Sequence, residues 1–318
     1  MTIKLAMVMD PIANINIVKD TSFAMLLEAQ ARDYELYYIE MPELFINSGE
    51  PCAMARKLRV MEDPEHWYEL EKPTQWSLAD FDVLLMRKDP PVDAEFIYAT
   101  HMFELAERRG TLVVNKPQSL RDFNEKLFAT WFAEHTPPTL VTSSKQQVKA
   151  FHAEHRDIIC KPLDGMGGTS IFRVKDDGNN LGVVAETLTQ NGKSYAMFQR
   201  YLPAIKDGDK RVLIVDGEVM PYCLARLPSD GETRGNLAAG GTGRPQPISD
   251  SDRMLAEAIA PTLVEKGLLF VGLDVIGDKI TEINVTSPTC VRELEAAYDI
   301  NICGKLFDAI EKRVKTAE

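Results

Sequence analysis

Apolar and polar positions over the first 120 residues follow two periods, one typical of strands and one typical of helices. Ile3–Met9 and Phe81–Met86 are short apolar runs, and Asp20 or Thr21 caps a segment with helical spacing between them. Strands that alternate with helices imply right-handed crossovers and a parallel sheet covered on both faces. The same pattern predicts strands at Glu35–Glu40 and Thr111–Asn115 and a helix from Asp93 to Gly110.

Ligands of such sheets bind beyond the carboxyl ends of the strands, so the segments after Met9, Met86 and Asn115 are candidate binding loops. The first of these, Asp10–Asp20, contains no glycine. A dinucleotide-binding fold needs a glycine-rich turn at this place, where the backbone approaches the pyrophosphate. The sequence therefore argues against an NAD-dependent enzyme.

Beyond Lys116 the pattern changes, and apolar runs joined by short turns predict antiparallel hairpins. Leu163–Gly168 is a glycine-rich turn, but it lacks the following helix and the Gly-Lys-Ser/Thr of a Walker loop. Asp216-Gly217 is a strong hairpin signal. The predicted strands are Asp157–Pro162, Thr169–Val174, Ala196–Leu202, Arg211–Val215, Glu218–Ala225, Leu268–Asp274 and Lys279–Val285, and Ser249 caps a helix that ends at Gly267.

One long segment, Leu227–Pro245, holds five glycines and almost no apolar bulk. A loop of that length without secondary structure is usually either functional or disordered. We therefore expect this segment, which contains Arg234, to form a lid over a ligand site.

The sharpest constellation for chemistry consists of Asp274, Glu282 and Asn284. Glu282 and Asn284 lie two residues apart, so a strand places both on one face, and a turn at Asp278 brings Asp274 opposite Glu282. Two carboxylates and an amide oxygen are suitable ligands for a hard cation such as magnesium. The alternative is a solvated hairpin face, which the apolar neighbours of these residues make the less favoured interpretation.

A second candidate is a phosphate site at the glycine-rich turn. The backbone amides of Gly165, Gly167 and Gly168 can approach a phosphate because no side chain intervenes, and Lys161 at the end of the preceding strand can neutralise it. Taken alone, this hairpin is also compatible with an ordinary turn. Lys126 is a weaker candidate for the same site, because a lone lysine on a helix is usually solvated.

Two further groups fit a nucleotide and a transferring phosphoryl group. Backbone groups near Leu202 can meet the edge of an adenine, and the Asp209 carboxylate can accept hydrogen bonds from ribose hydroxyls. Arg211 and Arg226 lie on facing predicted strands, and a guanidinium can bind two phosphate oxygens at once. The alternatives are an ordinary strand exit and arginines on the surface of a sheet.

Charge and composition limit the classes of partner. The chain has 318 residues, with 36 basic and 48 acidic side chains and a net charge of −12. Nucleic acids and anionic membrane surfaces require a basic face, so we expect neither as a partner. No apolar run predicts a membrane span, and five scattered cysteines favour a reducing compartment, so we expect a cytoplasmic protein. Only the segment 126–249, with 15 basic and 13 acidic residues, is net positive, and it holds the phosphate candidates.

In their order along the chain, these pieces resemble the ATP-grasp ligases: a lysine, a lysine before a glycine-rich hairpin, a strand followed by Leu-Pro, and Asp-x7-Glu-x-Asn. Longer blocks resemble bacterial glutathione synthetase more specifically and span nearly the whole chain. These blocks are residues 8–16 (VMDPIANIN), 86–91 (MRKDPP), 114–122 (VNKPQSLRD), 161–168 (KPLDGMGG), 232–241 (ETRGNLAAGG) and 282–289 (EINVTSPT).

The resemblance implies an α/β protein with a Rossmann-like parallel sheet in its N-terminal domain (residues 1–122). An ATP-grasp fold follows, whose small subdomain (123–202) and large subdomain (203–318) are two α+β units that clasp ATP. The implied reaction is the ATP-dependent ligation of γ-glutamylcysteine to glycine through an acyl phosphate, with Mg²⁺ or Mn²⁺. The resemblance also implies a homo-oligomer, specifically a tetramer.

The resemblance further implies roles for individual residues. Many ATP-grasp amide ligases carry an arginine two residues before the first metal aspartate, whereas Gly272 stands there in this sequence. We therefore expect catalytic charge stabilisation from Arg211, Arg226 and Arg234. Nucleotide contacts are implied for Lys126, Lys161, Gly165, Met166, Gly167, Gly168, Gln199, Tyr201, Leu202 and Asp209, metal contacts for Asp274, Glu282 and Asn284, and dipeptide contacts for Asp10, Arg87, Asn284, Ser287, Pro288 and Thr289.

Three alternatives remain open from the sequence, of which an NAD-dependent enzyme is the least favoured because the glycine fingerprint is missing. Another amide ligase of the superfamily, which joins D-alanines or adds glutamate to a protein tail, would share the ATP residues but not the blocks of the amino half. A nucleotide-binding regulator without turnover would not need Lys126, Lys161 and the complete metal set. No residue is assigned to the free glycine.

Overall fold

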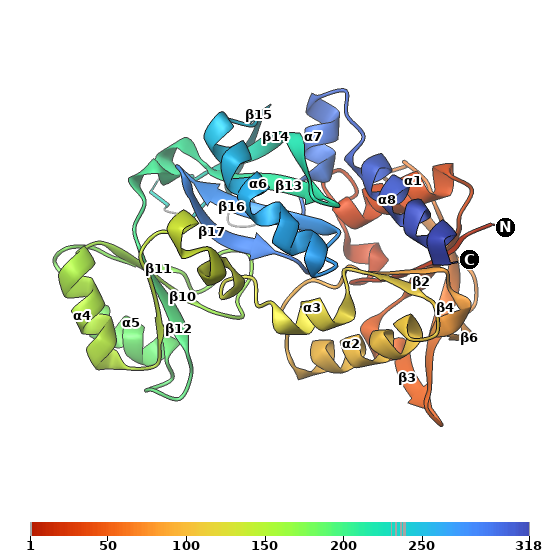
Figure 1. Cartoon of the computed structure of the whole chain (residues 1–318), viewed down its shortest axis with the longest axis horizontal. Coiled ribbons are helices and arrows are strands. Elements are labelled where there is room, and N and C mark those ends of the chain that lie inside the picture. Colours follow the sequence, from red (N-terminus) through yellow and green to blue (C-terminus); the bar gives the residue numbers. More distant parts are fainter. Residues whose placement is uncertain (1, 230, 233, 236, 238–239, 318) are drawn as a thin grey trace.

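The computed structural model describes residues 2–317, apart from residues 230, 233, 236, 238 and 239. Figure 1 shows three groups of elements: the N-terminal domain, a central five-stranded sheet with its helices, and a smaller four-stranded unit at the opposite end. The five-stranded sheet therefore lies between the other two groups. No helix among the described residues is long and apolar enough to cross a membrane.

The N-terminal domain has a parallel sheet at its centre, as the pattern predicts. Its strands β1 (Lys4–Val8), β2 (Glu35–Ile39), β7 (Val83–Met86) and β8 (Leu112–Val114) follow the order β2-β1-β7-β8. The Asp20 carboxylate accepts a hydrogen bond from the amide of Phe23 and so begins α1 (Thr21–Ala31). The other elements are η1 (Ile12–Asn14), η2 (Met41–Glu43), β3 (Leu44–Asn47), β4 (Glu50–Val60), β5 (Tyr68–Leu70), β6 (Thr74–Ser77), η3 (Leu78–Asp80), α2 (Ala94–Glu107) and α3 (Pro117–Asp122).

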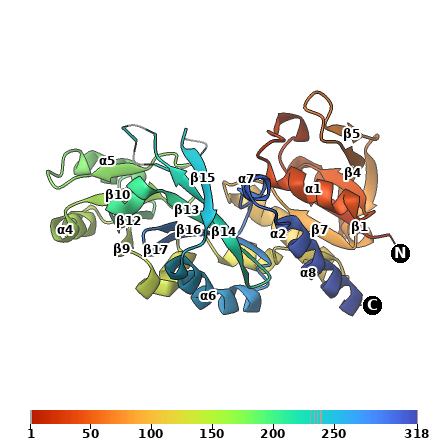
Figure 2. The ribbon, with the colours of Figure 1, turned by 90° about the horizontal axis from the view of Figure 1, so that it is seen from above.

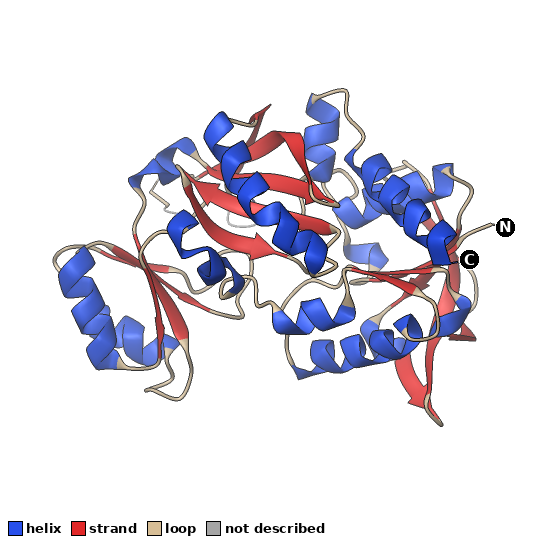
Figure 3. Cartoon of the chain, viewed as in Figure 1, coloured by secondary structure: helices blue, strands red, loops and turns tan. Residues whose placement is uncertain are grey.

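The small subdomain is an antiparallel sheet in the order β11-β10-β12-β9. Two helices cover one face of it (Figure 3), which leaves the other face for the large subdomain. A separate core within this unit contains Val148, Ile158 and Phe198. Its elements are β9 (Thr139–Thr142), α4 (Lys145–His155), β10 (Ile158–Pro162), β11 (Phe172–Val174), α5 (Leu181–Leu188) and β12 (Ala196–Arg200). The segment η4 (Phe128–His135), which precedes them in the chain, packs instead against β17 of the large subdomain, and its residue Phe128 belongs to the core of that sheet.

The large subdomain is an antiparallel sheet in the order β15-β14-β13-β16-β17. The predicted hairpin at Asp216-Gly217 is confirmed, as is the helix cap at Ser249, whose hydroxyl accepts from the amide of Asp252. Its elements are η5 (Pro203–Asp207), β13 (Asp209–Val215), β14 (Glu218–Leu227), β15 (Thr242–Pro247), α6 (Asp250–Glu265), β16 (Phe270–Ile276), β17 (Lys279–Asn284), α7 (Val291–Ala297) and α8 (Ile302–Ala317).

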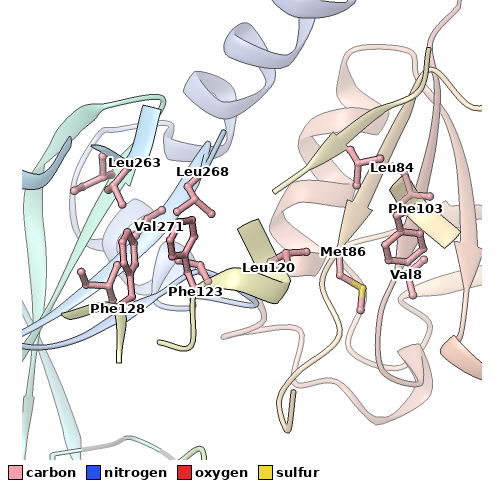
Figure 4. Close-up of a cluster of buried hydrophobic side chains, with 14 of the residues drawn as sticks. Val8, Leu84, Met86, Phe103, Leu120, Phe123, Phe128, Leu263, Leu268 and Val271 are labelled. Atoms are coloured by element: carbon pink, nitrogen blue, oxygen red, sulfur yellow. The ribbon is translucent and has the colours of Figure 1, made fainter. Parts of the chain in front are cut away.

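Two apolar cores join the N-terminal domain to the large subdomain. Alternate residues of β1 enter different cores, with Val8 in one and Met7 in the other, and both cores continue into the central sheet. Figure 4 shows Leu120 between the two parts of the first core, one with Phe123 and Phe128 and the other with Met86 and Phe103. The C-terminal helix α8 also lies against the N-terminal domain (Figure 2), where Arg32 contacts its residues Asp308 and Glu311. These two units therefore share their interior, whereas the small subdomain has its own.

Two predictions from the pattern are wrong in their bounds. The segment 227–245 is not one continuous loop, because β15 (Thr242–Pro247) pairs with β14, with Thr242 opposite Leu227. This strand carries no apolar alternation that could have predicted it. The strand that follows the glycine-rich turn, β11, begins at Phe172 and not at Thr169 as predicted. Residues 230, 233, 236, 238 and 239 of the predicted lid lie outside the described residues.

Candidate active site

A cavity that opens to solvent lies between the small sheet and the sheet of the large subdomain, with about 860 Å³ free of protein atoms when its open part is included. One wall comes from β10, β12 and the glycine-rich loop, and the other from β13, β16 and β17. Because strand side chains alternate, every second residue faces the cavity. The lining includes all the predicted nucleotide residues, Lys126, Lys161, Gly165, Met166, Gly167, Gly168, Gln199, Tyr201, Leu202 and Asp209, together with Arg234, Asp274 and Glu282.

Glu282 on β17 faces two lysines from outside its own sheet. Lys161 Nζ lies 3.2 Å and Lys126 Nζ 3.7 Å from Glu282 Oε1. Burial opposes the charge of Glu282, but the two ammonium groups outweigh it and lower the pKa of this carboxyl. Burial lowers the pKa of Lys161, although Glu282 opposes that shift. Lys126 is therefore a buried residue of the site and not a solvated helical lysine.

Asp274 lies directly opposite Glu282 in the hairpin, as the spacing predicts, and contacts two buried arginines. Arg211 Nε donates to Asp274 Oδ1 at 2.7 Å, and Arg226 Nη2 lies 2.9 Å from Asp274 Oδ2. Burial alone would raise the pKa of Asp274, but the two guanidinium groups hold it below its usual range. Arg211 and Arg226 are therefore buried residues of the site and not arginines on the surface of a sheet.

Asp209 contacts the same arginine as Asp274, Arg226, through one of its two carboxylate oxygens. Arg226 Nη2 lies 2.5 Å from Asp209 Oδ2, whereas Asp209 Oδ1 is buried without a hydrogen-bond partner among the described residues. Burial raises the pKa of Asp209 to about 7 despite the neighbouring guanidinium. A buried acceptor without a donor costs free energy, which a ligand hydroxyl would recover.

The glycine-rich loop is connected to both sides of the cavity. Gly167 (φ 63°) and Gly168 (φ 79°) have backbone conformations that favour glycine. Lys126 Nζ donates to the carbonyl of Gly165 at 2.7 Å, and Arg234 Nη1 donates to the carbonyl of Gly168 at 3.3 Å. Arg234 thus links the predicted lid to the loop that covers the predicted phosphate site.

Three of the residues predicted to bind the dipeptide, Arg87, Ser287 and Pro288, contact one another just after β7, and we call them the Arg87 region. Arg87 is 6% exposed, and it donates to Ser22 Oγ at 3.0 Å and to the carbonyl of Pro288 at 2.9 Å. Ser287 Oγ donates back to the carbonyl of Arg87 at 3.3 Å. These hydrogen-bond partners are neutral, and burial lowers the pKa of the guanidinium, although the carboxylates of Asp20 and Asp89 oppose that shift. Arg87 is therefore a buried cation suited to an anionic ligand.

Two further dipeptide candidates, Thr289 and Asp10, have different surroundings. Arg211 Nη1 donates to Thr289 Oγ1 at 3.4 Å, so Arg211 connects the Arg87 region to Asp274. Asp10 instead contacts Lys88 Nζ at 2.9 Å and accepts from the amide of Asp89 at 3.0 Å. Neither Thr289 nor Asp10 lines the cavity described above.

Gly272, the departure from the superfamily pattern, has a steric explanation. A Cβ atom at this position would lie 2.8 Å from Arg211 Cδ and 2.9 Å from Pro288 Cβ. The side chain of Arg211 comes from the neighbouring strand β13 and fills the space beside Gly272 on its way to Asp274. The guanidinium beside Asp274 thus comes from β13, and not from position 272 of β16, where the superfamily pattern has its arginine.

Asn284 lies at the end of β17, where its Nδ2 donates to the carbonyl of Gly272 at 3.2 Å. This bond leaves the side-chain oxygen available to a ligand. Among the described residues, no three His, Cys, Asp or Glu side chains are grouped to hold a metal ion. The candidate metal set is therefore two carboxylates, kept charged by their lowered pKa values, and one amide.

Glu125 belongs to this region although the sequence did not single it out. Its Oε1 accepts from the amides of Val285 and Thr286 at 2.9 and 3.0 Å and from the Thr286 hydroxyl at 2.8 Å. It thereby fixes the chain between Asn284 and Ser287. The sequence indicates a role for Glu125 only through its position directly before Lys126. That was not enough to predict its burial, because a lone acidic residue is usually exposed.

An antiparallel pair of sheets around a cavity with buried lysines, arginines and carboxylates defines an ATP-grasp ligase. Solved structures share this fold. A D-cycloserine synthetase has a TM-score of 0.67 at 17% identity, covering 98% of this chain and 99% of that one. The ATP-grasp ligase PsnB, complexed with a minimal precursor, has a TM-score of 0.63 at 19% identity with the same coverage.

Family models match nearly the whole sequence: the N-terminal domain of prokaryotic glutathione synthetase over residues 3–121, and its ATP-grasp domain over residues 125–299. Glutathione synthetases of Escherichia coli O127:H6 and Salmonella typhimurium are 65% identical over 313 and 312 residues. That of Vibrio parahaemolyticus is 62% identical over 313 residues. Each alignment covers 98% of this chain and 99% of the relative.

The chain belongs to the prokaryotic glutathione synthetase family. It is an ATP-dependent ligase of glutathione biosynthesis, which joins γ-glutamylcysteine to glycine. The family and the α/β ATP-grasp fold implied by the sequence resemblance are thus confirmed. The alternatives of a different amide ligase and of a regulator without turnover lose their support.

Proposed function

We propose that ligation takes place where the cavity meets the Arg87 region, with ATP bound in the cavity and the dipeptide beside it. One observation carries this proposal: the four buried cations Lys126, Lys161, Arg211 and Arg226 face three carboxylates, so the site has a surplus of positive charge. Such a surplus attracts anionic ligands, and the low dielectric strengthens the attraction.

The nucleotide assignments follow the walls of the cavity. We assign the phosphates to Lys126, Lys161 and the glycine-rich loop, and the ribose to the unpartnered oxygen of Asp209. The adenine is assigned to the opposite end, with Tyr201 among its contacts. The full set is Lys126, Lys161, Gly165, Met166, Gly167, Gly168, Gln199, Tyr201, Leu202 and Asp209.

Asp274, Glu282 and Asn284 are proposed as ligands of Mg²⁺, with Mn²⁺ as an alternative. Their hard oxygen donors and their placement on one hairpin support this assignment. When bound, such a cation neutralises negative charge between the phosphates and the reacting carboxylate. Meanwhile the paired lysines and arginines keep Asp274 and Glu282 deprotonated.

Arg87 is proposed to bind a carboxylate of γ-glutamylcysteine, with Ser287, Pro288 and Thr289 lining the same region. Asp10 and Asn284 are assigned to its edges. Arg211 lies between this region and Asp274 and can stabilise a phosphoryl group that moves from ATP to the cysteinyl carboxylate. Arg226 holds both Asp209 and Asp274, and Arg234 brings the lid to the glycine-rich loop.

The proposed reaction has two balanced steps. A carboxylate oxygen of the dipeptide attacks the terminal phosphorus of ATP, which forms an acyl phosphate and releases ADP. The amine of glycine then attacks the acyl carbon, phosphate leaves, and the amine loses a proton to give the amide. Because acyl phosphates hydrolyse, the lid that contains Arg234 must exclude water between the steps.

The Arg87→Ala variant tests the dipeptide site. Truncating one member of a buried charge pair costs about 2–5 kcal/mol, so we expect KM for γ-glutamylcysteine to rise about thirtyfold or more. KM for ATP should stay unchanged, because Arg87 does not line the cavity assigned to ATP. Steady-state ADP release gives both constants, and thermal unfolding tests whether the variant folds. Equal changes in the two constants, or no change in either, would contradict the assignment.

Organisation beyond the site is proposed from the same resemblance. We propose three working units, residues 1–122, 123–202 and 203–318, in which the lid spans the described residues between β14 and β15. A cytoplasmic location is supported by five cysteines that are all buried and free. We also propose a homotetramer, with ATP, γ-glutamylcysteine and glycine as its small-molecule substrates and no nucleic-acid or membrane partner.

A further inference from the structure

Tyr201, which follows β12 and lines the cavity, is stacked against an arginine from another strand. The guanidinium carbon of Arg173 on β11 lies 3.5 Å from the centre of the Tyr201 ring. Contact at this distance covers one face of the ring. Arg173 does not line the cavity, whereas Tyr201 does, so the arginine covers the ring from outside.

A single residue, Asp157, holds both members of this stack. Its Oδ1 accepts from Arg173 Nε at 2.9 Å and its Oδ2 from Arg173 Nη2 at 2.6 Å. Its backbone carbonyl accepts from the amide of Tyr201 at 2.9 Å. The bidentate pair fixes the plane of the guanidinium, and the backbone bond fixes the chain that carries the ring.

The sheet places this stack beside the base end of the proposed nucleotide site. Ile159 on β10 is paired with Arg173 on one side and with Gln199 on the other, so the three residues form one row across the sheet. Ile159 and Gln199 both line the cavity, as does Tyr201. The row therefore runs from the cavity wall outward to Arg173, at the edge strand of the small sheet.

We propose that Arg173, oriented by Asp157, is a positioning residue that fixes the Tyr201 ring as the outer wall of the nucleotide base site. This inference rests on the proposed ATP site and deepens it. A ring that is already fixed loses less conformational entropy when a base binds, so affinity increases without a new contact to the ligand. A surface ion pair that only braces the sheet would leave nucleotide affinity unchanged.

The test compares the wild type with Arg173→Ala and Arg173→Lys, using calorimetry with ADP and with inorganic tripolyphosphate, which has no base. We expect the Kd for ADP to rise about fivefold in Arg173→Ala, while the Kd for tripolyphosphate stays unchanged. Arg173→Lys should behave like Arg173→Ala, because an ammonium group keeps the charge but cannot stack as a plane. In steady-state assays, KM for ATP should rise, while kcat and KM for γ-glutamylcysteine stay constant.

Arg156→Ala is the matched control, because Arg156 belongs to the same subdomain and pairs with Asp176 at an exposed position. It should leave every constant unchanged. Asp157→Asn should raise the Kd for ADP in the same direction as Arg173→Ala, because it releases the guanidinium. An unchanged Kd for ADP in Arg173→Ala would overturn the inference, as would an equal loss of tripolyphosphate binding.

Failure of the proposed function is distinguishable from failure of this inference. The wild type could bind ADP and yet release no ADP when it is given ATP, γ-glutamylcysteine and glycine. This result would contradict the proposed ligation, but the Kd values of the variants for ADP could still be compared. A wild-type chain that does not bind ADP would overturn both. If Arg173→Ala fails to fold, as judged by thermal unfolding, the comparison with Arg173→Lys decides the inference.

Discussion

The Glu282→Gln variant is expected to lose at least about 100-fold of its magnesium-dependent ADP release while it keeps its fold. Glutamine has nearly the same shape but no charge, so the proposed metal site loses one of its two anionic ligands. Lys126 and Lys161 also lose the carboxylate that faces them at 3.7 and 3.2 Å. The loss of charge, and not of volume, is therefore the cause of the expected effect.

ADP release at several magnesium concentrations, together with thermal unfolding, measures this effect. Glu257→Gln is the matched control, because Glu257 is an exposed carboxylate on α6 whose partner Arg253 lies 4.0 Å away. It should retain full activity. Near-normal turnover by Glu282→Gln, with an unchanged response to magnesium, would contradict the proposed metal site.

The Arg211→Ala variant is expected to lower kcat by about 100-fold with a smaller change in the KM of either substrate. Arg211 connects Asp274, the proposed metal ligand, with Thr289 in the proposed dipeptide region. Its charge is thus placed where a phosphoryl group would pass between the substrates. Removing it also leaves buried Asp274 with Arg226 as its remaining arginine partner, which allows the pKa of Asp274 to rise.

Steady-state kinetics on Arg211→Ala and Arg211→Lys separate the contribution of charge from that of shape. Lysine keeps the charge but cannot donate to Asp274 and Thr289 from one rigid group, so we expect it to recover only part of the rate. Breaking a buried ion pair costs about 3–5 kcal/mol of stability, so unfolding should be measured alongside. A kcat equal to that of the wild type in a folded Arg211→Ala variant would remove Arg211 from the catalytic group.

The strands that position the site could be predicted because apolar residues recur along each of them and are buried. In β16 and β17 the alternation and the short turn together predicted both the hairpin and the pairing of Asp274 with Glu282. Strand β4 pairs antiparallel with β2, β3, β5 and β6 and so extends the N-terminal sheet. This extension was not predicted, because its strands mix exposed and buried positions without a clear period. The edge strand β15 gave no signal because none of its residues is buried and it carries no apolar alternation.

The order of the nucleotide candidates along the chain made it possible to expect them in one cavity. Their hydrogen-bond and ion-pair partners could not be predicted. Sequence alone cannot show that Arg226 is shared by Asp209 and Asp274, since that contact depends on how two strands face each other. Nor could it show why position 272 is glycine. That reason lies in the side chain of Arg211, which comes from the neighbouring strand and fills the space where a Cβ would stand.

ADP release with ATP, magnesium and γ-glutamylcysteine, with glycine, D-alanine or glutamate added in turn, tests the central claim most directly. We expect rapid release with glycine and release near background with D-alanine or glutamate, together with formation of one tripeptide per ADP. Release that does not depend on glycine, or that is as fast with either alternative amine, would contradict the assignment of this site to glutathione synthesis.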